Sequence, residues 1–242
     1  MTVLSRGVVI VLLGLALGAC SAQQPRPSAP DVDPWESYNR KMHAFNMGVD
    51  RVLMRPIARG YDAVMPDAPQ RGVRNFFHNL AYPVTFLNLL LQGKFEESAN
   101  ATGRFLVNST LGLFGFFDVA GKGGLPRYEE DMGQTLAVWG WKESRYLVMP
   151  FIGPYTVRDL LGRSFYGYFH PISYRVREYN DYSLLIIDLV TLRAELLPFQ
   201  EQIDNANDPY VLIRDVYLQN REFQIYDGDP PAPDYDALLE GD

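Results

Sequence analysis

The stretch GVRNFFHNLAYPVTFLNLLLQG (Gly72–Gly93) decides the fold class, because its apolar residues recur at helical spacing along most of its length. Phe76, Phe77 and Leu80 fall on one stripe, and the run after Pro83 is almost wholly apolar. Proline lacks the N–H that a helix interior needs, and a glycine is a frequent helix stop. The stretch therefore predicts a long helix that is kinked or broken at Pro83.

A second helix and an apolar segment follow directly along the chain. Lys94 to Ser109 is amphipathic at helical spacing, and Leu111 to Ala120 is an apolar stretch, apart from Asp118, that is interrupted by glycines at positions 112 and 115. The second segment is too short to cross a bilayer, which requires about 20 apolar residues. On composition alone we favour a place in the core over one in a membrane, since short apolar runs are more often buried.

Helix start signals occur on both sides of this central region. Asp33-Pro34-Trp35-Glu36 predicts a helix that Asp33 caps, with Glu36 completing a capping box. Asp208-Pro209 repeats the opening for a last helix to about Ile225. Two more helices are expected, one beginning near Thr156 and one over Asp181 to Leu197.

Two short segments have extended character. Thr135 to Trp141 and Tyr146 to Ile152 are expected as short strands or extended segments. Together with the helices they define the fold class as mainly α, a single helical domain with a short extended or β-hairpin segment around residues 135–152. No internal repeat or heptad run is visible.

The first 19 residues have the pattern of a secretory signal peptide, with a positively charged start and a short apolar run before small residues. The string LGAC ends at Cys20, the only cysteine, and is similar to a bacterial lipobox. We expect Cys20 to be lipidated and to become the new amino terminus. A single cysteine also excludes an intrachain disulfide.

The charge of the chain is moderately acidic, with a formal net value of −7. Residues 227–242 contain several acidic residues and no basic one, so most of the negative charge lies in this segment, which we expect to be a disordered tail. The remainder is close to neutral and lacks the basic footprint of nucleic-acid binding. Residues 20–32 are rich in proline and polar residues and are expected to form an extended linker.

Patterns for catalysis are weak. The histidines His43, His78 and His170 are far apart and form no metal-binding spacing, so no metal is expected. The chain has no G-x-S-x-G nucleophile elbow, and the glycines at 121–124 lack the ending of a phosphate loop. The carboxylates at 129–131 could supply acid and base groups, although adjacent acids beside a loop are usually solvated. We expect neither an enzyme nor a cofactor.

Several ordered segments resemble the MlaA (VacJ) lipoprotein family of Gram-negative outer membranes. The matching stretches include DPWESYNRKMHAFN, RPIARGYDAVMP, GVRNFFHNL, FLNLLLQGKF, GRFLVNSTLGLFGFFDVAG, GQTL, LVMPFIGPYTVRD and DPYVLIRDVYLQNREF. The chain departs from the family pattern at Glu143-Ser144-Arg145-Tyr146, and residues 160–205 match only loosely. The resemblance covers most of the chain that would remain after processing and assigns residues 33–226 to the helical domain.

The resemblance implies a ring-like array of amphipathic helices, lodged from the periplasmic side in the outer membrane and bound to a trimeric porin. Such a protein removes mislocalised phospholipid from the outer leaflet through a passive channel and passes it to a periplasmic carrier of the MlaC type. Under this interpretation the apolar segment faces the membrane or channel. The candidate residues are Asn108, Leu111, Leu113, Phe114, Phe116, Phe117, Trp139 and Trp141.

Two other functions stay open at this point. One is a structural adaptor that binds a porin or stabilises the envelope without transport, and the other is a phospholipid hydrolase. The asparagines Asn75, Asn79, Asn88 and Asn108 lie on apolar helical stretches and either bond neighbouring helices or line a polar path, the first being favoured.

Overall fold

The computed structural model describes residues 32–231 and consists mainly of helices. The predicted signal peptide, Cys20, nearly all of the linker and residues 232–242 lie outside the described residues. The first half contains α2 (Glu36–Val49), a π-helical turn (Asp50–Met54), α3 (Arg55–Val64), α4 (Asp67–Leu91), α5 (Phe95–Thr110), α6 (Val119–Lys122) and α7 (Met132–Val138). The second half contains β1 (Tyr146–Met149), β2 (Gly153–Thr156), α8 (Val157–Phe169), α9 (Pro171–Tyr179), α10 (Ser183–Glu195), a 3-10 turn (Leu197–Phe199), α11 (Gln200–Asp204) and α12 (Pro209–Ile225).

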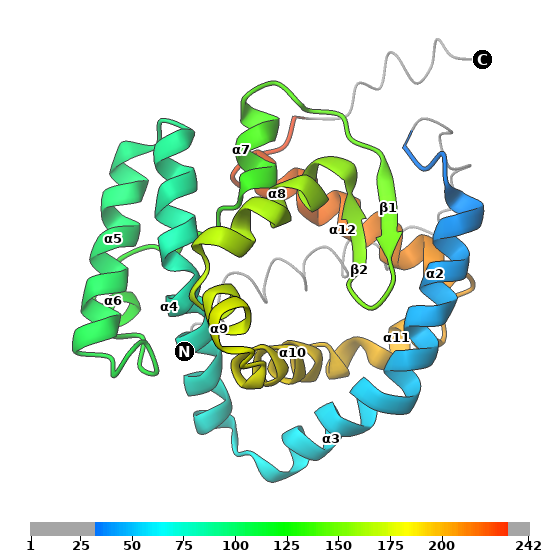
Figure 1. Ribbon diagram of the computed structural model, residues 1–242, viewed down its shortest axis with the longest axis horizontal. Coiled ribbons are helices and arrows are strands. Elements are labelled where there is room, and N and C mark those ends of the chain that lie inside the picture. Colours follow the sequence, from blue (N-terminus) through cyan, green and yellow to red (C-terminus); the bar gives the residue numbers. More distant parts are fainter. Residues whose placement is uncertain (1–31, 232–242) are drawn as a thin grey trace.

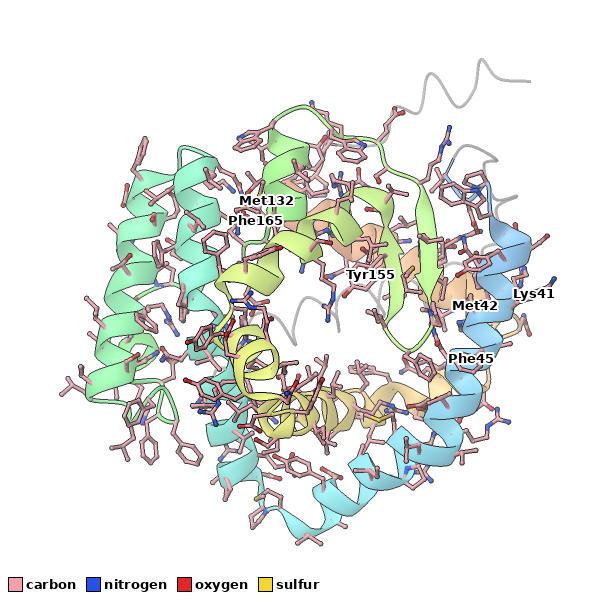
Figure 2. The ribbon with its side chains drawn as sticks, in the orientation of Figure 1. Lys41, Met42, Phe45, Met132, Tyr155 and Phe165 are labelled. Atoms are coloured by element: carbon pink, nitrogen blue, oxygen red, sulfur yellow. The ribbon has the colours of Figure 1, made fainter. Side chains whose placement is uncertain are left out.

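The helices follow one another around a central region (Figure 1). The continuous run from α2 through α3 forms one side, α4 forms the opposite side with α5 outside it, and α7, α8 and α12 lie along the top of the view. Helix α10 closes the lower side, where it packs against α3 and α4. From α2, Met42 and Phe45 point toward the central region that the helices surround, while Lys41 points away from it (Figure 2). This arrangement confirms the mainly α, ring-like fold class.

Local signals explain most helix ends. Helix α4 runs unbroken through Pro83 and packs against α5, so the predicted kink does not end the helix. It stops before Gly93, whose φ of +78° is a conformation that glycine adopts without strain. The carboxylate of Asp208 accepts hydrogen bonds from the N–H groups of Tyr210 and Val211 at 3.1 and 3.2 Å, which confirms the predicted start of α12.

The predicted role of Asp33 as a helix cap is wrong. Helix α2 begins after Trp35 without a side-chain cap, and Asp33 instead lies buried between α2 and α12. Its carboxylate accepts hydrogen bonds from Asn39 Nδ2 at 2.8 Å, from the Tyr210 hydroxyl and from Arg214 at 3.4 Å. Two of these partners, Tyr210 and Arg214, come from the far end of the chain, so an interior contact replaces the local cap.

The extended segment predicted at Thr135 to Trp141 is also wrong. Residues 132–138 form α7, and Asp131 caps it by accepting a hydrogen bond from Gln134 N at 3.0 Å. The cap and the burial of Thr135 and Ala137 outweigh the extended preference of threonine, valine and tryptophan. Helix α9 was not anticipated from the sequence at all.

The predicted hairpin exists a few residues further along the chain. β1 pairs antiparallel with β2 from Tyr146 opposite Thr156 to Met149 opposite Gly153. Asn39 fastens the hairpin to α2: its Oδ1 accepts from Val148 N at 2.8 Å and its Nδ2 donates to the Tyr146 carbonyl at 3.2 Å. The hairpin therefore lies beside α2, as the figures show (Figure 1).

Apolar packing is divided among small clusters. One joins α4 to α5 through Tyr82, Leu89 and Ala101, and another joins β1 to α12 through Tyr146 and Tyr210. Among the described residues, buried polar and charged side chains outnumber buried apolar ones. The ring must therefore be held together in part by polar contacts.

Buried arginine–aspartate contacts supply those polar links. Asp159 is the clearest case, because its carboxylate contacts Arg158 Nε and Arg221 Nη2, both at 3.0 Å, and accepts from the Thr156 and Tyr217 hydroxyls at 2.7 and 2.8 Å. Burial alone would raise the pKa of Asp159, but the two guanidinium groups and these hydrogen bonds hold it below its usual value. This cluster ties β2, α8 and α12 together.

Replacing Asp159 with Asn should lower the free energy of unfolding by about 3–5 kcal/mol, because Arg158 and Arg221 lose a buried negative partner. Chemical denaturation in detergent micelles followed by circular dichroism measures this loss. Glu178→Gln removes the exposed ion pair with Arg177 and should change the same quantity by less than about 1 kcal/mol. Equal effects of the two substitutions would show that the cluster does not hold the ring.

Candidate functional site

An exposed apolar turn follows α5. The side chains of Leu111, Leu113, Phe114 and Phe117 are 71, 62, 75 and 48% exposed, whereas Phe116 is half-buried. These residues were predicted as a segment facing a membrane or channel, and the structure places four of the five on the surface. We call residues 111–117 the apolar turn. An apolar patch of this kind is typical of a surface that meets a membrane or a protein.

The backbone of the apolar turn is held in an unusual conformation. Leu113 and Phe114 have φ values of +51° and +58°, a region that side-chain-bearing residues rarely adopt, and Gly115 follows at +93°. Gly115 N donates to the Asn108 carbonyl at 2.7 Å and Phe114 N donates to the Ser109 carbonyl at 3.1 Å. A strained conformation persists only where its surroundings impose it, so the turn is a fixed feature.

Polar contacts beneath the turn impose this conformation. Arg104 binds both carboxylate oxygens of Asp118 at 2.7 and 2.8 Å, and Asn108 Nδ2 donates to the same carboxylate at 3.0 Å. Asn79 on α4 donates to Ser109 Oγ at 2.8 Å and to the Phe114 carbonyl at 3.4 Å. The base of the turn is thus polar and buried while its tip is apolar and exposed.

Asn108, a candidate channel-facing or membrane-facing residue, lies in the base of the turn. Its side chain is buried, and its Oδ1 accepts from Ala120 N at 2.9 Å. Asn75 donates to the Phe116 carbonyl at 3.3 Å, and Asn88 accepts from the Thr135 hydroxyl at 2.8 Å. All four asparagines therefore bond neighbouring parts of the chain, which is the structural role that the sequence favoured.

Both tryptophans proposed for an interface are exposed, and Trp139 contacts the end of α4. Trp139 is 56% exposed and Trp141 is 39% exposed. Trp139 Nε1 donates to the Leu91 carbonyl at 3.0 Å, which satisfies one of the free carbonyls at the end of α4. Trp139 therefore has a bonded indole N–H and an exposed ring, an arrangement suited to an interface.

Helix α10 adds a second apolar surface. Its sequence SLLIIDLVTLRAE is apolar on nearly every side, yet Ile186, Leu189 and Leu192 are all more than 40% exposed. An apolar helix is normally buried in a core or in lipid, so its exposure indicates contact with something other than water. None of the helices in the described range 32–231 combines the length and the apolarity needed to cross a bilayer.

A contact between α2 and the tip of the hairpin was missed by the sequence reasoning. Asn46 Nδ2 donates to the Met149 carbonyl at 2.9 Å, and its Oδ1 accepts from Phe151 N at 2.7 Å. The rings of Phe45 and Phe151 meet edge to face with centroids 5.0 Å apart. Phe45 lies on the side of α2 that faces the central region (Figure 2). Its contact with Phe151 therefore holds the hairpin tip next to that region.

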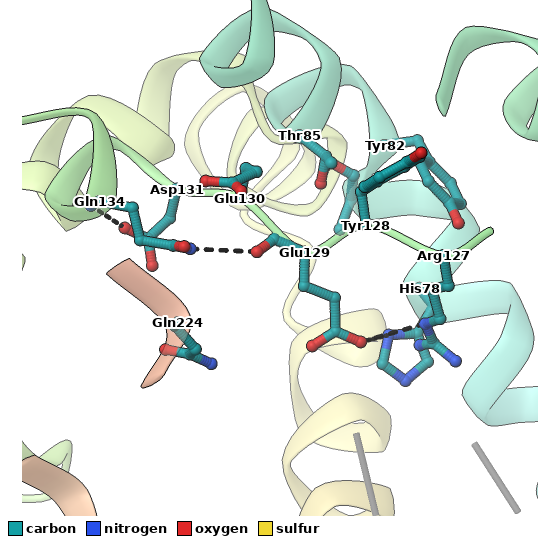
Figure 3. A pocket seen from close by; sticks show the side chains of 11 residues that line it. His78, Tyr82, Thr85, Arg127, Tyr128, Glu129, Glu130, Asp131, Gln134 and Gln224 are labelled. Atoms are coloured by element: carbon teal, nitrogen blue, oxygen red, sulfur yellow. Dashed lines mark hydrogen bonds and ion pairs between the residues drawn. The ribbon is translucent and has the colours of Figure 1, made fainter. Parts of the chain in front are cut away.

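Within residues 32–231, the helices leave a larger and a smaller cavity that bear on function. The larger, of about 420 Å³, lies between α2 and the α11–α12 region, with Met47, Ile203, Arg51 and Asp204 among its walls. The smaller, of about 200 Å³, lies between α4, the 127–131 loop and α12 (Figure 3). Its polar walls are His78, Arg127, Glu129, Glu130, Asp131, Gln134 and Gln224.

The three histidines considered for a metal site are not assembled into one site. His43 lines the larger cavity, His78 the smaller one, and His170 caps α9 by accepting from Ile172 N at 3.3 Å. Residues 32–231 contain no group of three acidic, histidine or cysteine side chains able to hold a metal. Glu129 pairs with Arg127 at 3.0 Å, so these two charges in the wall of the smaller cavity offset each other.

Glu130 is the most perturbed carboxylate of the smaller cavity. Burial raises its pKa to about 7, although Gln92 at 2.7 Å and Lys94 at 3.2 Å favour its charged form. Lys94 also pairs with Asp227 at 2.6 Å, so the start of the acidic segment is bonded to the ring. Burial lowers the pKa of His78, the neighbouring histidine, to about 4.

Helices joined into a ring by buried ion pairs, with an apolar turn and an apolar helix on the surface, define a protein that meets a membrane or a partner through apolar contacts. Comparisons with known proteins specify the family. The sequence model of the MlaA lipoprotein family matches residues 31–224, including the stretches where the motifs agree least. The chain belongs to the MlaA lipoprotein family.

Individual relatives agree with this assignment. An uncharacterized protein of Rickettsia felis is 37% identical over 195 residues, covering 80% of this chain and 78% of the relative. The intermembrane phospholipid transport system lipoprotein MlaA of Escherichia coli K12 is 32% identical over 195 residues, covering 79% and 77%. A solved structure concerned with maintenance of bacterial outer membrane lipid asymmetry superposes with a TM-score of 0.71 at 30% identity, covering 80% of this chain and 98% of that one.

The pKa of Glu130 generates a prediction about stability. An acid whose pKa is raised on folding binds its proton more tightly in the folded state. Its stabilising contribution is therefore complete below about 4.5, the unfolded value, and is lost as the pH rises through about 7. The stability of the wild type relative to Glu130→Gln should fall across this range.

The difference between the two proteins is the decisive quantity, because His78 and His170, with pKa values lowered to about 4, act in the opposite direction in both. Unfolding free energies from denaturant titrations at several pH values between 4.5 and 7 give this difference. Parallel curves for the wild type and the variant would contradict the raised pKa.

Proposed function

We propose that this chain is an outer-membrane lipoprotein that removes mislocalised phospholipid from the outer leaflet and passes it to a periplasmic carrier of the MlaC type. The observation that carries the proposal is the structural match over 98% of a solved chain concerned with outer membrane lipid asymmetry. The name of the Escherichia coli relative, which places that protein in an intermembrane phospholipid transport system, supports the same function.

The physical demands of lipid transfer fit the architecture. A phospholipid that leaves its leaflet must keep its charged headgroup out of hydrocarbon, because burying an unpaired charge there is very costly. Its acyl chains must stay in apolar surroundings. Helices satisfy their own backbone hydrogen bonds in lipid, so a ring of helices can separate a headgroup path from the surrounding acyl chains. The passage proposed here is passive and involves no catalytic step.

The anchor and the apolar surfaces would act together in placing the ring. Lipidation of Cys20 would hold the chain on the periplasmic side of the outer membrane, with residues 20–32 as a tether. Several acyl chains bind a membrane durably, whereas one chain binds it marginally. The apolar turn and α10 would then lie in the acyl region, with Trp139 and Trp141 near its boundary. A trimeric porin is the proposed neighbour in the membrane.

The apolar turn generates a prediction about membrane binding. Leu113→Asp combined with Phe114→Asp should weaken binding to phospholipid vesicles about tenfold or more, because each lost apolar side chain removes roughly 1.5–3 kcal/mol of burial in lipid. Flotation of the Cys20→Ser protein with vesicles isolates this contribution from that of the anchor.

A matched control places the same two charges elsewhere. Gln202→Asp with Gln219→Asp alters exposed positions on α11 and α12 and should leave flotation unchanged. Thermal unfolding of both double variants checks that the ring is intact, since all four side chains are exposed. Equal flotation of the two double variants would show that the apolar turn does not enter the membrane.

The function itself is tested in cells that lack the protein. Amine-reactive labelling of intact cells should detect more phosphatidylethanolamine in the outer leaflet after deletion, and the wild-type chain should restore the original amount. Unchanged labelling would contradict transport and favour a structural adaptor. Free fatty acid released at enzymatic rates from labelled phospholipid by the purified protein would instead favour a hydrolase.

A further inference from the structure

Exposed tyrosines are concentrated in one short part of the chain. Among the described side chains five tyrosines are exposed, and four of these lie between the end of α8 and the start of α10. Their exposed fractions are 74% for Tyr168, 48% for Tyr174, 62% for Tyr179 and 50% for Tyr182. By contrast, the tyrosines at the centres of the two apolar clusters are almost fully buried. This part of the chain therefore uses tyrosine as a surface residue.

Two arginines of α9 pack against the faces of these rings. The guanidinium carbon of Arg177 lies 5.6 Å from the centre of the Tyr168 ring and 6.0 Å from that of Tyr174. The guanidinium carbon of Arg175 lies 5.4 Å from the centre of the Tyr179 ring, and the rings of Tyr174 and Tyr179 meet edge to face at 6.0 Å. Cation–π contacts of this kind hold the five side chains together on the surface. We call these five residues the tyrosine–arginine patch.

Each arginine of the patch is paired with a neighbouring acid. Arg177 contacts Glu178 at 3.0 Å and Arg175 contacts Asp181 at 2.5 Å, and both arginine side chains remain about half exposed. Exposed pairs contribute little to stability, so the need to hold the fold together does not explain them. A protein partner that is recognised by charge faces a surface of the opposite sign. This surface instead carries charges of both signs side by side, as a layer of zwitterionic headgroups does.

The patch continues directly into the apolar helix α10. After a turn at Asn180, whose φ is +49°, the chain enters α10 at Ser183. The exposed side chains of α10 are bulky and apolar, and Ile186 and Leu192 are 57 and 56% exposed. A surface of tyrosine and arginine on α9 is thus followed by a surface of isoleucine and leucine on α10 (Figure 1). The same order is met on passing from the headgroups of a bilayer to its acyl chains, where tyrosine is enriched at the boundary.

We propose that the tyrosine–arginine patch lies in the phospholipid headgroup layer and sets how deeply the ring enters the membrane. This inference rests on the proposed function and adds to it the surface that meets the headgroups. A tyrosine has an apolar ring and a polar hydroxyl, so it is most stable where acyl chains give way to headgroups. An arginine lays its methylene groups along apolar surface and keeps its charged end in the polar layer. The N–H groups of Arg175 and Arg177 that the acids leave free bind phosphate oxygens there.

Two other surroundings match the patch less well. A surface that faces only water gains nothing from exposed rings, whereas burial of their apolar area at a boundary is favourable. A protein interface has an apolar centre and a charged rim, but here the arginines lie among the rings, and all five side chains are close to half exposed or more. A headgroup layer accounts for the rings and for the charges between them.

Single spin labels measure the depth of the patch in a membrane. Cys20 is the only cysteine and lipidation would consume its thiol, so one introduced cysteine is the only site that a thiol-reactive nitroxide labels. Tyr179→Cys reports on the patch, Ile186→Cys on α10 and Gln219→Cys on an exposed position of α12. The lipidated chain is placed in vesicles of phosphatidylethanolamine and phosphatidylglycerol. Collisions with oxygen, which concentrates among acyl chains, and with a water-soluble nickel complex then give the depth of each label.

The label at position 186 should collide mainly with oxygen and the label at 219 mainly with nickel. The label at 179 should lie between them, within about 5–7 Å of the hydrocarbon boundary, which is the thickness of the headgroup region. A label at 179 that lies in water, lies as deep as the one at 186, or is protected from both reagents by protein would overturn the inference while transport stands. A label at 186 in water would instead overturn the membrane placement in the proposed function, and this inference with it.

Substitution of the rings tests the same inference by flotation of the Cys20→Ser protein with vesicles. Tyr174→Ser combined with Tyr179→Ser should weaken binding about tenfold, because two apolar rings are lost from the boundary. Tyr174→Trp combined with Tyr179→Trp should retain binding, since tryptophan shares the preference for this layer. Gln202→Ser with Gln219→Ser is the matched control and should change nothing, and thermal unfolding checks each variant. Unchanged binding of the serine variant, or an equal loss in the tryptophan variant, would contradict a headgroup location.

Discussion

Buried pairing of arginine with aspartate is the interaction on which the ring depends. A chain whose helices surround a central region cannot gather all its apolar side chains into one cluster, and the buried apolar residues within 32–231 form two small clusters instead. Asp33, Asp118 and Asp159 each bind a buried arginine from another part of the chain. Because removing one member of such a pair leaves an uncompensated charge, each contact resists opening of the ring at its own position.

Local sequence signals determine where several helices begin and end. Contacts with other parts of the chain determine the outcomes that the sequence did not predict. Asp208 and Gly93 act as the sequence indicates, because a cap and a positive φ depend on neighbours within a few residues. Asp33 has the same local pattern but binds Asn39 and Arg214 instead. Thr135 has extended propensity but is buried in α7 against Asn88 of α4. Arg214 lies 181 residues from Asp33, and Asn88 lies 47 residues from Thr135. No local window of sequence contains these two partners, so local patterns could not predict the outcomes.

The sequence showed that the apolar turn is apolar, but it could not show whether its side chains are exposed or buried. An apolar run such as Leu111 to Phe117 is equally compatible with a core and with a membrane surface. The choice depends on positive φ values that turn the side chains outward and on Arg104, which binds Asp118 beneath them. Asn108, a candidate channel-facing or membrane-facing residue by sequence, belongs to the buried base of the turn. By contrast, the isolated acid within SLLIIDLVTLRAE was visible in the sequence as an anomaly and could have been singled out.

Because the buried arginines of the ring are paired with aspartates, an unpaired carboxylate beside apolar side chains is an exception in this molecule. In water an exposed arginine or aspartate without a partner is ordinary, because solvent satisfies it at little cost. On α10, beside apolar side chains such as Ile187 and Leu189, the carboxylate of Asp188 is poorly solvated. Elsewhere in the molecule, buried charges such as Asp159 have a partner of opposite charge next to them. Burial therefore raises the pKa of Asp188, and the positive charge of Arg163 offsets this only in part.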